Sequence, residues 1–295
     1  MFGFACVLLA TIGLSAKAIL IKLIYIEAPD IDAISILALR FIVAFPFFML
    51  LLAFDRKRKS PPPFTKRHFG SFILLGMVGF YLSAILDFSA LAYITASLER
   101  LILFLYPTFV VLISFFIRPE EINRHVIAAL VTSYIGVAIV FSDQSLVMTD
   151  DITKGVLLVF GAAIVFATYT VASVKQIKYH GSIQFTGYAM IAATTMTLIH
   201  AVSIHGTSFF NQSFYVYGLI LLMALFSTVM PLILIAEGVK RMGASSASII
   251  STLGPVMTIS LAYLLLDETI GFAQAFGGLM IILGVFFVAR VKNKE

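Results

Sequence analysis

The segment that decides the fold lies at residues 96–117 and reads ASLERLILFLYPTFVVLISFFI. Apart from Glu99 and Arg100 it carries no charge, and its 22 residues would form a helix about 33 Å long at 1.5 Å per residue. The hydrocarbon core of a bilayer is about 30 Å thick. The segment therefore predicts a transmembrane helix that contains two charged residues and a helix-disrupting proline, Pro107.

Apolar blocks of similar length recur along the whole chain. It has 295 residues, of which 61% are hydrophobic and 12% charged, and its mean hydropathy is +1.06. A soluble domain carries about 25% charged residues, and a membrane β-barrel shows short alternating segments that this sequence lacks. We predict an all-α membrane protein with ten transmembrane helices, near residues 3–24, 34–53, 70–90, 96–117, 126–141, 155–174, 183–203, 215–236, 244–266 and 271–289.

The charges between the predicted helices set the orientation. Basic residues flank loops that stay in the cytoplasm, so the loops rich in Lys and Arg are placed inside. The predicted outer loops carry only Lys154 as a basic residue and are otherwise acidic. We therefore expect a multi-pass protein of the inner or plasma membrane with both termini in the cytoplasm. This topology explains the net charge of +5, so no nucleic-acid partner is expected.

The sequence resembles itself when it is shifted by 148 positions. The shift aligns residues that are uncommon in apolar segments: Pro107 with Pro255, Glu120 with Glu268 and Gly136 with Gly284. Each copy contains five predicted helices, and an odd number makes the second copy enter the bilayer from the opposite side. We expect two inverted five-helix repeats, at residues 1–142 and 155–290. Secondary transporters often have such repeats, with the solute site at their interface.

Two stretches also resemble a known family. LERLILFLYPT at residues 98–108 and STLGPV at residues 251–256 are similar to signature regions of the drug/metabolite transporter superfamily, of the EamA type. The resemblance covers the whole chain with its ten helices in two repeats. It implies a secondary transporter of small organic metabolites such as amino acids, acting by alternating access and commonly as an exporter.

Five ionisable residues fall inside the predicted helices of the first repeat, and a charge there is costly unless it is paired or hydrated. They are Lys17, Arg40, Asp87, Glu99 and Arg100. All lie within about 12 Å of the predicted outer face. One interpretation is a gate or cavity rim whose surplus positive charge attracts a carboxylate, with Lys17 and Arg40 as the deepest members. The other is a static ion-pair network, or residues that reach the interface.

Seven further residues are candidates for lining the cavity or a gate: Tyr106, Pro107, Tyr169, Glu237, Ser251, Thr252 and Pro255. A proline within a helix frees a backbone carbonyl, which neighbouring groups or cavity water then satisfy. The alternatives are kinks that serve only packing, tyrosines that anchor the membrane interface, and a Glu237 that only flanks a loop.

The sequence shows no catalytic set, metal-ligand spacing or phosphate-binding loop. We therefore expect no enzyme activity, cofactor or metal, with a small organic solute and the lipid bilayer as partners. An intramembrane enzyme and a receptor-like helical bundle are the alternatives. Small residues in the fifth and tenth predicted helices serve either packing within the monomer or a homodimer interface.

The predicted topology can be tested by cysteine labelling in a Cys6→Ala background. A cysteine at Pro62 should react with a membrane-impermeant thiol reagent only from the cytoplasmic side, and one at Asp150 only from outside. Labelling of both positions from the same side would contradict the inverted arrangement.

Overall fold

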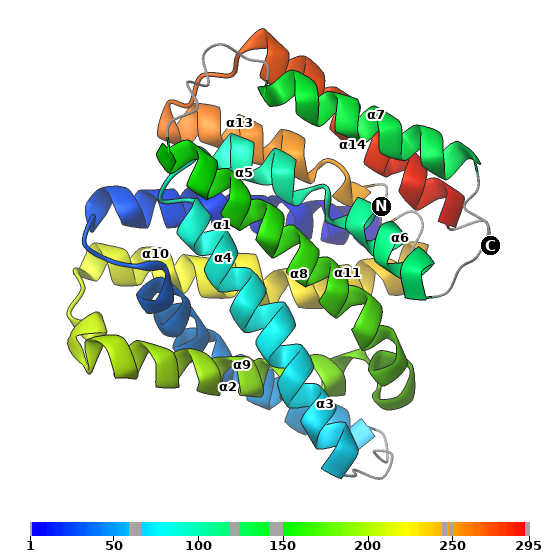
Figure 1. Cartoon of the computed structure of the whole chain (residues 1–295). Helices are drawn as coiled ribbons and strands as arrows, with labels where there is room; N and C mark the ends of the chain where they lie inside the picture. The colour runs from blue at the N-terminus through cyan, green and yellow to red at the C-terminus, as the bar shows by residue number, and fades with distance from the viewer. Residues whose placement is uncertain are drawn as a thin grey trace.

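The structure is a computed structural model that describes residues 2–58, 66–117, 124–141, 150–243, 247 and 250–292. All regular secondary structure in these ranges is helical (Figure 1). The first half contains α1 (Phe2–Glu27), α2 (Ala33–Arg58), α3 (Lys66–Gly76), the π-helix η1 (Met77–Leu82), α4 (Ser83–Ala90), α5 (Ala96–Leu103), α6 (Tyr106–Ile117) and α7 (Arg124–Phe141).

The second half has a similar order of elements. It contains α8 (Asp150–His180), α9 (Ser182–His205), the 3₁₀ turn η2 (Ser208–Phe210), α10 (Phe214–Ala224), the π-helix η3 (Leu225–Val229), α11 (Met230–Met242), α13 (Gly254–Leu266) and α14 (Phe272–Lys292).

Within the described residues, seven helical stretches are long and apolar enough to cross a membrane. They span Phe2–Glu27, Ala33–Asp55, His68–Ala90, Ala96–Ile117, Asp150–His180, Ser182–His205 and Phe214–Met242. Three shorter apolar helices cover Ile127–Phe141, Gly254–Leu266 and Phe272–Phe287. Each of the ten predicted spans overlaps one of these stretches. The all-helical membrane fold is therefore confirmed, while the ten-helix arrangement in two repeats stays a prediction.

The helix that holds the opening segment is interrupted beside its proline. α5 ends at Leu103 and α6 begins at Tyr106, so Pro107 lies in the first turn of the new helix. Pro255 likewise lies in the first turn of α13. A proline fits the first turn of a helix because its missing N–H has no partner there in any case. The breaks thus leave the regular hydrogen bonding of both following helices intact.

Elements that correspond in the sequence duplication also occupy corresponding places in the packing of the two halves. The π-helices η1 and η3 begin at Met77 and Leu225, which are 148 positions apart. α1 packs on α11 and α13, while its counterpart α8 packs on α4 and α6. α2 and its counterpart α9 pack on each other. This exchange of partners is expected of two halves related by a two-fold axis, while their inverted orientation in the membrane stays a prediction.

Small residues join α7 to α14, which lie side by side in Figure 1. A Cβ atom added at Gly277 would lie 2.5 Å from the carbonyl oxygen of Gly136. One added at Gly284 would lie 2.6 Å from the carbonyl oxygen of Ala129. The small residues that the sequence singled out in these helices therefore provide close packing within the chain. A homodimer stays a prediction.

Gly277→Ala should destabilise the protein by about 1–3 kcal/mol, since the new methyl group meets backbone atoms that cannot rotate away. The matched control is Gly218→Ala in α10, where an added Cβ meets nothing within 4 Å. There the better helix propensity of alanine should leave stability unchanged or raise it by up to about 1 kcal/mol. Thermal unfolding in detergent measures both. Equal effects would show that the α7–α14 contact is loose.

Candidate functional site

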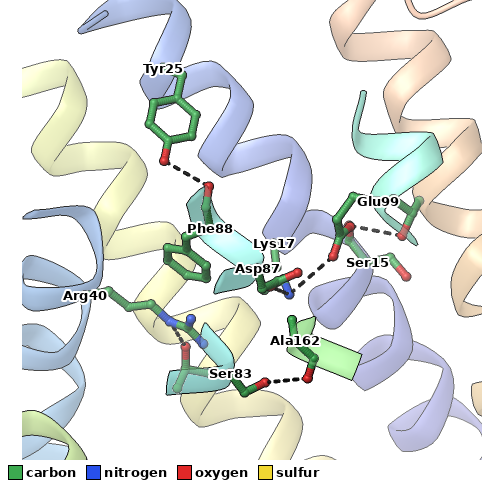
Figure 2. A network of polar contacts seen from close by, with 11 residues as sticks. Ser15, Lys17, Tyr25, Arg40, Ser83, Asp87, Phe88, Glu99 and Ala162 are labelled. Carbon is green, nitrogen blue, oxygen red and sulfur yellow. Dashed lines mark hydrogen bonds and ion pairs between the residues drawn. The ribbon is translucent and has the colours of Figure 1, made fainter. Parts of the chain in front are cut away.

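Three of the predicted charged residues meet between α1, α4 and α5. The Nζ of Lys17 forms an ion pair with Oδ2 of Asp87 and lies 3.8 Å from Oε1 of Glu99. Figure 2 shows the lysine reaching toward both carboxyl groups. Asp87 is 4% exposed and Glu99 is fully buried. The structure therefore favours the ion-pair interpretation for Lys17, which is neutralised within the protein.

The two carboxyl groups of this cluster lie beside the same ammonium group. Their negative charges also act on each other. Ionised carboxylates accept hydrogen bonds but cannot donate them. Among the described residues, no donor forms a hydrogen bond to either oxygen of Glu99 or to Oδ1 of Asp87. Two ionised carboxylates here would repel each other, and protonation of one of them removes the repulsion.

Arg100 extends the cluster toward α13. It interacts electrostatically with both carboxyl groups and with the hydroxyl of Tyr106. One terminal nitrogen of its guanidinium group lies against Gly254, 2.8 Å from where a Cβ of that residue would be. Its Nε is buried without a hydrogen-bond partner in the described part of the chain. Arg100 thus joins the carboxylate cluster to the turn before Pro255.

Arg40 approaches the same region from α2 and makes different contacts (Figure 2). Its Nε donates a hydrogen bond of 2.8 Å to Oγ1 of Thr228, in the π-helix η3. The guanidinium carbon lies 5.4 Å from the centre of the Phe88 ring, a cation–π distance. Among the described residues no carboxylate forms an ion pair with Arg40, and its terminal nitrogens have no recorded hydrogen bond. Arg40 thus has a hydroxyl and an aromatic ring as its direct partners, while its charge also acts on Asp87 from beyond ion-pair distance.

Two hydrogen bonds tie α1 to the start of α13 beside this cluster. The hydroxyl of Ser15 donates to the carbonyl oxygen of Gly254 at 3.0 Å, and the hydroxyl of Thr258 donates to the carbonyl oxygen of Ser15 at 3.3 Å. Ser251 instead donates to the carbonyl oxygen of Ala247 at 3.1 Å, within its own chain segment. Thr252 lies in the turn that precedes α13. The turn before Pro255 is thus attached to the helix that holds Lys17.

The remaining predicted residues lie elsewhere. Tyr169 is buried in a separate core cluster, with its ring centre 5.1 Å from that of Phe80. Glu237 pairs with Arg241 one turn further along α11, at 2.5 Å and with both side chains partly exposed. The structure thus places Tyr169 in the core and Glu237 in a local surface pair, away from the charge cluster.

The sequence did not predict four residues that contact the charge cluster or the helices around it. They are Ser15, Phe88, Thr228 and Glu268. Glu268 accepts hydrogen bonds from the first turn of α5, at 2.7 Å from the backbone N–H of Ala96 and 2.7 Å from the hydroxyl of Ser97. A carboxylate at a helix N-terminus is electrostatically favourable. Its alignment with Glu120 in the duplication was the one signal that set Glu268 apart. No sequence signal distinguished Ser15 or Thr228, since isolated Ser and Thr are common in apolar helices.

Comparison with known proteins agrees with this architecture. The sequence profile of the EamA-like transporter family matches residues 1–142 and 153–290. The chain is 28% identical to the uncharacterized transporter YcbK of Bacillus subtilis (strain 168), over 97% of this chain and 91% of YcbK. It is 26% identical to the uncharacterized transporter YyaM of the same organism, over 86% of this chain and 83% of YyaM.

One solved structure, described as a crystal structure of a protein, superposes over 99% of this chain and 98% of its own, with a TM-score of 0.66. At 15% sequence identity this likeness concerns the fold alone.

Lys17→Met should lower the stability of the protein by about 3–5 kcal/mol, because it leaves the buried Asp87 carboxylate without its counter-ion. The double variant Lys17→Met/Asp87→Asn should recover part of that loss. Arg241→Met, which breaks the partly exposed pair with Glu237, is the control and should cost at most about 1 kcal/mol. Unfolding in detergent measures all three. A double variant no more stable than Lys17→Met would show that the two residues are not coupled.

Proposed function

The chain belongs to the EamA-like transporter family, and from this premise we propose that it exports small organic metabolites such as amino acids by alternating access. The named relatives are transporters, which fits a protein that is not an enzyme. The proposal places the protein in the cell membrane with both termini in the cytoplasm, where the basic loops predict them to lie.

Alternating access is supported by the relation between the halves. The family profile matches each half separately, and the helix contacts of one half recur in the other with the partners exchanged. Inverted halves of this kind can rock about a site at their interface and expose it to each side in turn. The charge cluster contacts both halves, since Lys17 and Glu99 belong to the first half and Gly254, beside Arg100, belongs to the second, and this supports a solute site there.

The observation that carries the choice of solute is the state of Arg40. Its Nε is held by Thr228 of the second half while its terminal nitrogens are left without a recorded partner. A guanidinium group offers parallel N–H donors that match the two oxygens of a carboxylate. We therefore assign Arg40 to the carboxylate of the solute and Lys17 to the internal pair with Asp87. The cation–π contact with Phe88 fixes the direction of the guanidinium group.

The direction and class of solute can be tested in cells. Overproduction of the protein should raise the amino acids or related metabolites in the medium, and deletion should raise them inside the cell. Mass spectrometry of medium and cell extract measures both. An unchanged profile of small organic acids and amino acids under both conditions would overturn the proposed substrate class.

The role of Arg40 can be tested in proteoliposomes with a radiolabelled mixture of common amino acids. Arg40→Met should reduce transport about tenfold or more, since a hydrogen bond to a charged group is worth about 1.5–3 kcal/mol. Competition by amino acids should weaken much more than competition by their amides. Arg241→Met removes a cation outside the cluster and should transport normally. Equal weakening for acids and amides would exclude Arg40 as the carboxylate site.

A further inference from the structure

We propose that Asp87 and Glu99 hold a proton between them and that this proton is the ion whose movement drives transport. The proposal rests on the proposed function, because coupling needs a transport cycle, and it adds the identity of the coupling ion. The first observation is that Lys17 is not equally close to the two carboxyl groups. The lysine is in direct contact with Asp87 but lies 3.8 Å from Glu99.

Glu99 is poorly stabilised as an anion. It is 0% exposed, and neither of its oxygens has a hydrogen-bond donor among the described residues. An ionised carboxylate removed from water needs hydrogen bonds and a close counter-ion, and without them the group takes up a proton. The close counter-ion in this cluster is already in contact with Asp87. Glu99 is therefore the member that binds the proton, and Asp87 is the member that keeps its charge.

The repulsion between the two carboxyl groups points to the same assignment. Two ionised carboxylates beside one ammonium group repel each other, and a proton on one of them removes the repulsion. A proton on Glu99 does so while Asp87 keeps its ion pair with Lys17. In this state the cluster holds two cations, Lys17 and Arg100, against one anion.

The groups around Glu99 define what can release the proton. α1 presents Lys17, α4 presents Asp87, and Arg100 follows on the same helix. α8 contributes apolar residues such as Val156 and Val159 to the core shared with α5, and α13 presents the backbone of Gly254. Among these charges, Lys17 is the cation that forms an ion pair with one carboxyl group and lies 3.8 Å from the other. Its position therefore decides which carboxyl group is ionised.

Release of the proton follows from a shift of Lys17 toward Glu99. The O–H bond of Glu99 breaks, the bonding electron pair stays on the carboxylate, and the proton passes to water. The lysine then neutralises Glu99, while Arg100, whose charge acts on both carboxyl groups, compensates Asp87, and the cluster holds two cations against two anions. α1 packs along α11 and α13 whereas α4 packs along α8, so a movement of the first of these groups of helices against the second changes the distance between Lys17 and Asp87.

The bound proton can be observed without knowledge of the solute. Infrared difference spectra of the purified full-length protein, titrated with pH, should show the C=O stretching band of a buried protonated carboxylic acid. Glu99→Gln should remove this band. Glu27→Gln is the matched control, since Glu27 is exposed at the end of α1, and it should leave the band in place.

A second variant keeps the test decisive if Glu99→Gln does not fold. Asp87→Asn leaves Lys17 free to pair with Glu99, so it should also remove the band at the same pH values. Absence of a protonated-acid band from the folded wild-type protein at every pH tested would overturn the proposal. Persistence of the band in the folded Glu99→Gln protein would overturn it as well.

Coupling is tested with the radiolabelled amino-acid mixture in proteoliposomes that carry an imposed pH gradient. The wild type should accumulate label in response to the gradient, and Glu99→Gln should lose this response. A Glu99→Gln protein that follows the gradient as the wild type does would refute the assignment. If the wild type moves none of the amino acids, the proposed function fails, while the infrared band still decides the proton site.

Discussion

A charge inside a bilayer must be compensated within the protein, and this requirement organises the centre of the molecule. Lys17, Asp87, Glu99 and Arg100 come from three different helical segments and meet in one buried group. Because ionisable side chains tolerate hydrocarbon so poorly, their mutual attraction fixes how α1, α4 and α5 are placed. The apolar helix faces around them provide packing, and the need to pair the charges limits which helices can meet at this depth.

The same centre is where the helices depart from regular geometry. α5 gives way to α6 and the chain turns before α13, next to Pro107 and Pro255, and the π-helix η3 presents Thr228 to Arg40. Backbone irregularity inside a membrane persists where protein groups or cavity water satisfy the freed atoms. Here side chains of neighbouring helices do part of this work, as Ser15 does for the carbonyl oxygen of Gly254. Charges and backbone breaks thus share one region.

The helices could be predicted from the sequence more completely than the contacts within the site. Helix positions could be predicted because an apolar block of about twenty residues has few other uses. The grouping of Lys17, Asp87 and Glu99 followed from counting residues from the helix ends. Such counting gives the depth of each residue in the membrane but not the pairing of cations with anions. The pairing depends on how each helix is rotated about its own axis. The contact of Arg40 with Thr228 joins residues 188 positions apart, and no local pattern reports such a neighbour.

The charge cluster has no copy in the second half, although the helices around it do. The duplication aligns Lys17 with Val165, Asp87 with Ile235 and Glu99 with Ala247, all of them apolar. In a molecule with identical halves, the form open to the cytoplasm and the form open to the outside would be related by a two-fold rotation and would have equal free energy. With this buried charge cluster in one half only, the two forms break different interactions and differ in free energy. Under the proposed cycle the unloaded protein therefore has a preferred resting side, which is set by residues that the duplication did not preserve in both copies.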